Sequence, residues 1–292
     1  QSLTLTGTGN LTFGPSSSFG GNITTTSPAL FFNGCQFDGT VNSVKTGATN
    51  DGSKGNNIFN AAFSVTNTGS GYLLMGNGNP DTWQSTAEFN NLSSGQNMYI
   101  AYSSTGNICN GDVLFNNQPA GNFWIYPNSY GINTQFNGNI SVVNLNGSGV
   151  SFGANTGTST LAPGKTISIG AAGFNSGGLV LKGFAQSGAG TPQSLITTGT
   201  SYIQYSTGSS FDGALSSSSP GLFFNGSVFN GSVQCVKTGT TNDQSQGNNV
   251  FNGPAVFTNN GTGYLMMTAN NPDAYNDDVT FIKGNTGLVY PN

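Results

Sequence analysis

The chain has 292 residues, with 45 glycines, only 5% charged residues and no histidine. All six basic residues are dispersed lysines and the net charge is −4, which excludes the clustered basic surface that nucleic-acid binding requires. The lack of histidine excludes Ser/His/Asp and Cys/His nucleophile systems and most zinc sites.

Short runs of alternating apolar and polar residues recur along the chain and are separated by Gly, Asn, Ser and Pro. In chain order they include SLTLTG at 2–7, NLTFG at 10–14, GYLLMG at 71–76, NMYIAY at 97–102, NFWIYP at 122–127 and GVSFG at 149–153. A period of two bounded by turn formers predicts β-strands, and no segment has a helical stripe. The 21 phenylalanines and 10 tyrosines further indicate a chain that buries a core, because disordered chains are poor in aromatic residues.

A phrase of the form aromatic-Asn/Asp-Gly-x-apolar marks a shorter repeat within a longer one. Pairs such as Lys45 and Lys237, or Asp81 and Asp273, are 192 positions apart, and no insertion is needed to align the copies. The phrase recurs every 18 to 27 residues, with further coil starts expected near Leu161 and Gln193. Its first residues are predicted to stack as a ladder inside the fold: Phe19, Phe37, Phe59, Trp83, Phe136, Phe211, Phe229, Phe251 and Tyr275.

Each phrase is expected to return a strand to the same face in the same direction. This pattern is typical of a parallel β-helix, or β-solenoid. We therefore expect an all-β parallel β-helix with coils of roughly 18–32 residues and a 192-residue super-repeat. Residues 1–192 form the first full super-repeat of about eight coils, and residues 193–292 form a second, truncated one in the same continuous solenoid.

The Asn/Asp and Gly of each phrase are predicted to form tight turns in which both residues accept positive φ. The residues concerned are Asp38, Asn60, Asn137, Asn230 and Asn252, followed by Gly39, Gly138, Gly231 and Gly253. Cys35 aligns with Ser227 and Cys235 with Ser43, while Cys109 stands where the ladder normally has phenylalanine. The three cysteines are therefore expected to be small buried residues without disulfides.

Three charged residues do recur, Lys45, Asp51 and Asp81, as Lys237, Asp243 and Asp273. One interpretation is a cation or ligand site in each super-repeat. The interpretation that we favour is a set of turn and surface residues that cap backbone groups or form weak surface ion pairs.

No catalytic, cofactor-binding or metal-binding residue is predicted. The carboxylate pairs that a glycosidase would need reduce to Asp277 with Asp278, which align with Ser85 and Thr86 in the first copy, and to Asp81 with Glu88. We therefore expect a protein that is not an enzyme and needs no cofactor.

The phrases FNGSV, TNTGSGYLLMGNGNPD and STLAPGKTISIG resemble the giant repetitive cell-surface adhesins of Bacteroidota-type bacteria, which are exported by the type IX secretion route. The resemblance covers essentially the whole chain and implies an extracellular or cell-surface filament used for adhesion, gliding or contact between cells. The resemblance does not assign a binding role to any residue of this chain.

The first hypothesis for function is thus a stiff, repetitive structural segment of an extracellular filament or adhesin. The alternatives are a carbohydrate-binding or ice-binding β-solenoid, based on exposed threonines in TLTGTG and NITTTS and aromatics in NMYIAY and NFWIYP, and less favourably a polysaccharide-degrading enzyme.

Further copies of the repeat are the expected partners, with lateral self-association or surface glycans as additional possibilities. Gln1 opens at a coil boundary and Asn292 falls inside a coil, so the solenoid is expected to continue at both ends in one polypeptide. No segment of about 18 apolar residues is present, so no membrane span is expected.

Overall fold

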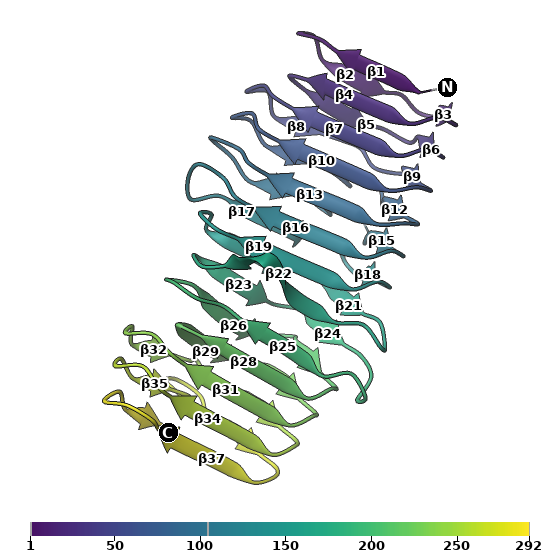
Figure 1. Cartoon of the computed structure of the whole chain (residues 1–292). Coiled ribbons are helices and arrows are strands. Elements are labelled where there is room, and N and C mark those ends of the chain that lie inside the picture. Colours follow the sequence, from purple (N-terminus) through teal and green to yellow (C-terminus); the bar gives the residue numbers. More distant parts are fainter. Residues whose placement is uncertain (1, 104, 292) are drawn as a thin grey trace.

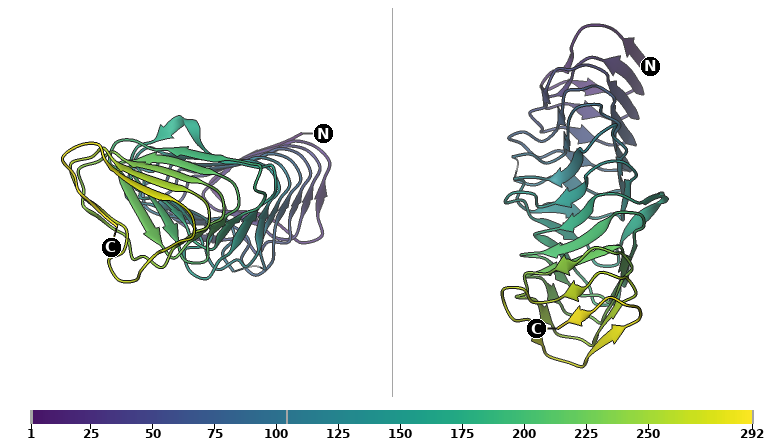
Figure 2. Two further views of the ribbon diagram at one scale, coloured as in Figure 1. Left: turned by 90° about the horizontal axis from the view of Figure 1, so that it is seen from below. Right: turned by 90° about the vertical axis from the view of Figure 1, so that its left-hand side faces the viewer.

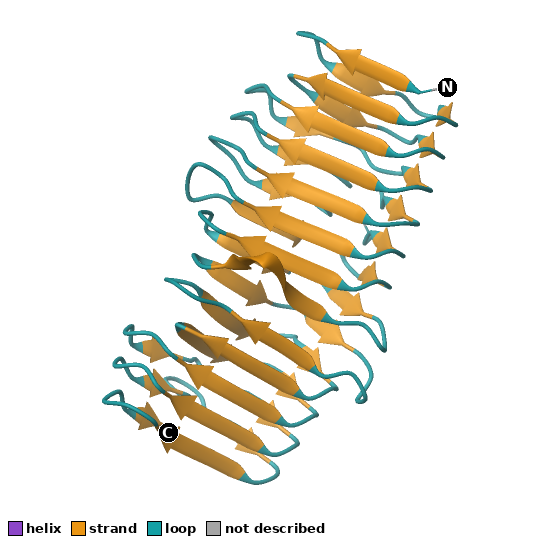
Figure 3. Cartoon of the chain, in the orientation of Figure 1, coloured by secondary structure: helices purple, strands orange, loops and turns teal. Residues whose placement is uncertain are grey.

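The computed structural model describes residues 2–103 and 105–291 and confirms an all-β parallel β-solenoid (Figures 1 and 3). The solenoid has about 12 turns of about 24 residues, and no helix occurs among the described residues. The chain begins at one end of the elongated body and finishes at the other (Figure 1). Gln1 and Asn292, on which the expectation about the chain ends depends, lie outside the described residues.

Each coil contributes one strand to each of three faces, and every strand pair is parallel. Face one comprises β1 (Leu3–Thr6), β4 (Ile23–Ser27), β7 (Val41–Lys45), β10 (Phe63–Asn67), β13 (Ala87–Asn91), β16 (Val113–Asn117), β19 (Ile140–Asn144), β22 (Ile167–Phe174), β25 (Gln193–Ile196), β28 (Leu215–Ser219), β31 (Val233–Lys237), β34 (Ala255–Asn259) and β37 (Val279–Lys283).

Face two follows face one in each coil. It comprises β2 (Leu11–Phe13), β5 (Leu30–Phe32), β8 (Asp51–Gly52), β11 (Leu73–Leu74), β14 (Met98–Tyr99), β17 (Trp124–Asn128), β20 (Gly149–Phe152), β23 (Gly178–Leu181), β26 (Tyr202–Ser206), β29 (Gly221–Asn225), β32 (Asp243–Gln244), β35 (Leu265–Met266) and β38 (Val289–Tyr290).

Face three completes the coil as a single 12-stranded sheet. It comprises β3 (Ser18–Phe19), β6 (Gln36–Phe37), β9 (Ile58–Phe59), β12 (Thr82–Trp83), β15 (Ile108–Cys109), β18 (Thr134–Phe136), β21 (Ser159–Leu161), β24 (Phe184–Gln186), β27 (Ser210–Phe211), β30 (Val228–Phe229), β33 (Val250–Phe251) and β36 (Ala274–Tyr275). The stacked coils enclose one core along the whole axis (Figure 2).

The core is filled by the inward-facing half of each strand. Strands of face one alternate buried and more exposed residues, as in β4 and β10, because successive side chains of a strand point to opposite sides. Faces one and two add further buried rings beside the row of face three, such as Phe63 and Phe89 on face one and Phe32 and Phe152 on face two.

The predicted ladder residues occupy one register position on face three. That position reads Phe19, Phe37, Phe59, Trp83, Cys109, Phe136, Leu161, Gln186, Phe211, Phe229, Phe251 and Tyr275. Adjacent rings stack where both residues are aromatic; for example, the ring centroids of Phe37 and Phe59 are 4.9 Å apart at an interplanar angle of 5°.

One predicted coil start is wrong. Gln186, not Gln193, holds the face-three register position between Leu161 and Phe211, whereas Gln193 begins β25 on face one. The predicted coil start is misplaced because Gln186 is not aromatic and so does not match the pattern that marks most of the other coils.

The glycine of each phrase is required for a different reason from the predicted one. Gly39, Gly138, Gly231 and Gly253 do not have positive φ. A Cβ on Gly39 would lie 2.4 Å from the carbonyl carbon and oxygen of Gly21 in the preceding coil. Glycine therefore permits close approach of successive coils at the corner between faces three and one.

The residues before these glycines also lack positive φ. Their side chains instead form an exposed row of hydrogen bonds along the same corner, in which Asn60 Nδ2 donates to Asp38 Oδ1 at 2.6 Å and Asn252 Nδ2 donates to Asn230 Oδ1 at 2.7 Å. This row ties neighbouring coils together outside the core.

Among the described residues, no helix is long and apolar enough to cross a membrane.

Candidate functional site: buried polar junctions between sheets

The sheets of faces one and two are interrupted at three places among the described strands: between β5 and β8, between β29 and β32, and between β22 and β25. The first two interruptions are 192 residues apart, and at each the chain lengthens the connection between faces one and two. Residues 28–29 connect β4 to β5, whereas residues 46–50 connect β7 to β8. The longer connection accompanies the point at which β8 no longer pairs directly with β5.

Side chains replace the missing main-chain acceptors at the first junction. The N–H of Leu30 donates to Asp51 Oδ2 at 2.7 Å, and the N–H of Phe32 donates to Ser53 Oγ at 2.9 Å. The main chain of β8 meanwhile pairs onward with β11. Asp51 and Ser53 thus join β5 to β8 where these two strands have no ladder pairing, and main-chain pairing between the two coils resumes at the bridge between Asn33 and Gly55.

The second super-repeat builds the same junction. The N–H of Leu222 donates to Asp243 Oδ2 at 2.9 Å, and the N–H of Phe224 donates to Ser245 Oγ at 3.0 Å. We name these two arrangements the aspartate junctions: Asp51 with Ser53, and Asp243 with Ser245.

A buried lysine accompanies each aspartate junction, so the expectation of surface residues is wrong. Lys45, Asp51, Lys237 and Asp243 all have 0% exposure. Lys237 Nζ lies 3.5 Å from Asp243 Oδ2 and donates to the Gly239 carbonyl at 2.9 Å, while Lys45 Nζ donates to the Gly47 carbonyl at 2.7 Å. The part of the prediction that assigned backbone capping to these lysines and aspartates agrees with the structure.

Burial sets the protonation behaviour of these pairs. Desolvation lowers the pKa of Lys45 and Lys237 and raises the pKa of Asp51 and Asp243, and the attraction within each pair opposes both shifts. Removal of one partner would leave the other charge buried without compensation.

Asp81 is buried in a row of side chains at the corner between faces two and three. Its Oδ1 accepts hydrogen bonds from Asn57 N at 2.9 Å and Asn57 Nδ2 at 2.7 Å, whereas Oδ2 has no partner among the described residues. Burial raises the pKa of Asp81 to about 7. Asp273 holds the equivalent place and accepts from Asn249 N at 2.8 Å.

A glutamine side chain bridges the third interruption, between β22 and β25. The N–H of Ile167 donates to Gln193 Oε1 at 2.8 Å, and Gln193 is fully buried. Its Nε2 donates to the carbonyls of Lys165 and Thr191 at 3.2 and 3.1 Å. Each of the three interruptions among the described strands is therefore bridged by a buried polar side chain.

Sequence reasoning missed Ser53 and Gln193 as junction residues and Asn57 as the buried partner of Asp81. The available signal was the recurrence of Ser53 as Ser245 and of Asn57 as Asn249 at the 192-residue offset, although such recurrence does not by itself show where a sheet is interrupted.

The carboxylate pairs considered for catalysis are not assembled into one site. Asp81 is buried inside the solenoid, while Glu88 lies at an outward-facing position of β13. Asp277 and Asp278 are exposed neighbours before β37, and Asp277 Oδ1 accepts the N–H of Asp278.

The three cysteines are free and buried, as predicted. Cys235 Sγ lies 3.0 Å from Ser217 Oγ, and Cys35 Sγ donates to the Gly14 carbonyl at 2.7 Å. Cys109 fills the register position that aromatic residues hold in most other coils.

Comparison with known proteins adds no relative, because no family model, curated protein or solved structure matches this chain.

Proposed function

We propose that this chain is a structural segment of a long extracellular filament or surface adhesin, in which the solenoid serves as a stiff, repetitive scaffold. The observation that carries the proposal is the recurrence of the aspartate junction at Asp51 and Asp243. A scaffold must stay continuous where its cross-section changes, and these side chains keep neighbouring sheets hydrogen-bonded at the change.

The surface chemistry supports the same proposal. Neutral amide side chains are paired along much of the corner between faces three and one, and only 5% of the residues are charged. Salt screens exposed charges but has little effect on neutral hydrogen bonds, so such a scaffold would keep its stiffness over a wide range of ionic strength. The resemblance to Bacteroidota adhesins suggests the cell surface as its setting, with further copies of the repeat as its partners.

Two observations disfavour the ice-binding alternative and the alternative in which exposed aromatic rings of NMYIAY and NFWIYP stack on sugars. Outward threonines pair between β1 and β4, as Thr4 with Thr24, but Asn42 takes the next position on β7. The rings of Tyr99 and Tyr126 stack on each other with centroids 5.2 Å apart, so these ring faces are less free to stack on a sugar.

The filament proposal can be tested on native cells of the source organism with antibodies raised against the purified chain. Immunogold electron microscopy is expected to label extended fibres or a layer outside the cell envelope. Label confined to the cell interior would contradict the proposal.

A further inference from the structure

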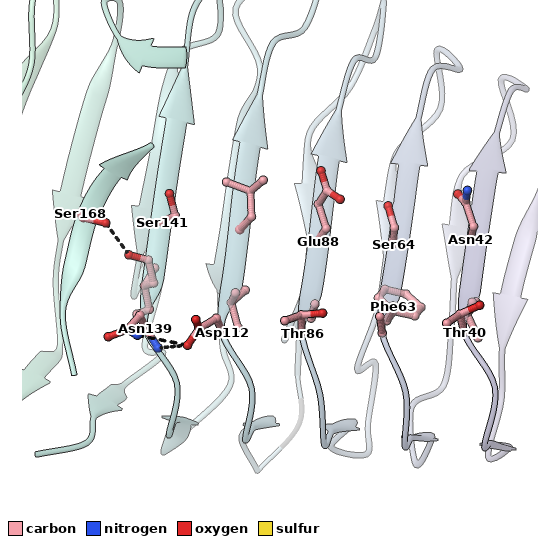
Figure 4. Close-up of a pocket in the computed structure, with 16 residues that line it drawn as sticks. Thr40, Asn42, Phe63, Ser64, Thr86, Glu88, Asp112, Asn139, Ser141 and Ser168 are labelled. Atoms are coloured by element: carbon pink, nitrogen blue, oxygen red, sulfur yellow. Dashed lines mark hydrogen bonds between the residues drawn. The ribbon is translucent and has the colours of Figure 1, made fainter. Parts of the chain in front are cut away.

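A groove runs along the outer side of face one and crosses six strands, β7, β10, β13, β16, β19 and β22 (Figure 4). It has a volume of about 560 Å³. One wall is a row of outward side chains at equivalent register positions: Asn42, Ser64, Glu88, Leu114, Ser141 and Ser168. The other wall consists of the residues that precede the strands, among them Thr40, Thr86 and Asp112.

Three polar side chains of the groove wall differ from those of the neighbouring corner in being unpaired. Asn42, Ser64 and Glu88 make no side-chain hydrogen bond to the described part of the chain, and the only bonds drawn between lining residues involve Asn139, Asp112, Ser168 and Ile140 (Figure 4). At the corner, by contrast, Asn60 bonds to Asp38 and Asn137 bonds to Asn110. The groove therefore offers hydroxyl, amide and carboxylate groups to a ligand.

The direction and charge of the groove restrict the ligand. The groove follows the solenoid axis, with one set of polar groups per coil at a strand spacing of about 4.8 Å, which suits an extended polymer with one unit of comparable length per coil. Its described lining includes the carboxylates of Glu88 and Asp112 and no lysine, so a polyanion would be repelled. Carboxylates and amides that accept hydrogen bonds are well matched to a polymer rich in hydroxyl groups.

We propose that this groove binds a neutral, linear polysaccharide lying along the solenoid axis. Glu88 and Asn42 would accept and donate hydrogen bonds to sugar hydroxyls, and Leu114 would contact the apolar face of a sugar ring. This inference is independent of the filament proposal, because an isolated chain would bind as well as an assembled one.

The second super-repeat supplies substitutions that the fold accepts. On β34 and β37, Val256 and Thr280 hold the positions that Ser64 and Glu88 hold on β10 and β13, with the same register between neighbouring strands. The double variant Ser64→Val/Glu88→Thr is thus expected to fold while losing the carboxylate of Glu88 and the hydroxyl of Ser64 and gaining one hydroxyl at position 88. Thr258→Val, at an outward position on β34 outside the groove, is the matched control.

Isothermal titration calorimetry with cellohexaose, xylohexaose and mannohexaose tests the proposal, with hexagalacturonate as the anionic comparison. The whole chain is expected to bind at least one neutral oligosaccharide and to bind hexagalacturonate more weakly. The double variant should bind the same neutral oligosaccharide about tenfold more weakly or worse, because hydrogen bonds to a charged group are lost, while Thr258→Val should bind as the parent does.

Three results would overturn the proposal: no binding of any neutral oligosaccharide, tighter binding of hexagalacturonate, or unchanged binding by the double variant. Circular dichroism and melting temperature distinguish loss of the groove from loss of the fold. If the double variant is unfolded, Asn42→Ala replaces it, with the same expected loss of affinity.

Discussion

Asp51 Oδ2 accepts a hydrogen bond from the main-chain N–H of Leu30 at 2.7 Å, across a gap between two sheets. The side chain stands where a main-chain carbonyl would be in an uninterrupted solenoid. Because the N–H of Leu30 is buried, loss of this acceptor would leave an unsatisfied donor at a cost of about 1–3 kcal/mol.

The buried pair of Lys45 and Asp51 is expected to be energetically coupled. Asp51→Asn keeps an acceptor oxygen but leaves Lys45 charged and buried, so we expect it to lower the free energy of unfolding by about 3 kcal/mol or more. Lys45→Met with Asp51→Asn should cost less than the sum of the two single changes. A double-mutant cycle by urea denaturation measures this difference, and additive single effects would show that the pair is not coupled.

The buried carboxylate of Asp81 is expected to make stability depend on pH. Its folded pKa of about 7 lies above the ordinary value of 3.8, so the folded state holds a proton that the unfolded state has released. Stability should therefore be full below about pH 4 and fall as pH rises to about pH 7, by an amount on the order of 4 kcal/mol. Thermal unfolding between these limits measures the slope.

Asp81→Asn is expected to remove the part of this slope that Asp81 contributes, leaving the part due to Asp51, Asp243 and Asp273, whose pKa values burial also raises. It should raise the melting temperature at neutral pH, since its amide oxygen can still accept from Asn57. Asp273→Asn is the matched variant in the second copy, and it should have a smaller effect because Asp273 is less buried. If Asp81→Asn keeps the full pH dependence of the parent chain, Asp81 is not its source.

The stacked aromatic row should respond locally to the loss of one ring. Phe37→Ala removes a fully buried side chain and should cost about 3–5 kcal/mol through lost transfer energy and a cavity. Since coils contact chiefly their neighbours, faster hydrogen exchange should be confined to a few coils around β6. Uniformly faster exchange along the entire chain would contradict coupling between neighbours alone.

Close approach of coils predicts a contrast between two nearby glycines. Gly39→Ala would place a Cβ 2.4 Å from the backbone of Gly21, whereas a Cβ on Gly20 would meet nothing within 4 Å. We expect Gly39→Ala to lower stability by about 1–3 kcal/mol or more and Gly20→Ala to be nearly neutral. Equal melting temperatures for the two variants would rule out the steric explanation.

The fold could be predicted because each coil carries a recognisable sequence repeat. The aromatic phrase marks face three in most coils, and its constant connection to face one keeps Phe37 and Val41 four residues apart, as Phe59 and Phe63 are. Where Gln186 replaces the aromatic residue, the pattern fails and the coil start was misplaced. The role of Gly39 was also misjudged, because the distance between coils cannot be read from one strand.

The junctions were harder to predict because they depend on where a sheet is interrupted in space. A lysine between turn formers is usually exposed, and only the recurrence of Lys45 and Asp51 as Lys237 and Asp243 distinguished these residues. The groove on face one gave no sequence signal, because its polar residues come from six different coils.

The central claim is that buried side chains keep the solenoid continuous at its sheet interruptions, and amide hydrogen exchange at Leu30 and Leu222 tests it most directly. If the junctions are continuous, these amides should exchange as slowly as those in the uninterrupted strands β10 and β13. Exchange at Leu30 and Leu222 that is orders of magnitude faster than in β10 would show that face two opens at these junctions, although faces one and three stay paired there, and would contradict the claim that the side chains keep it continuous.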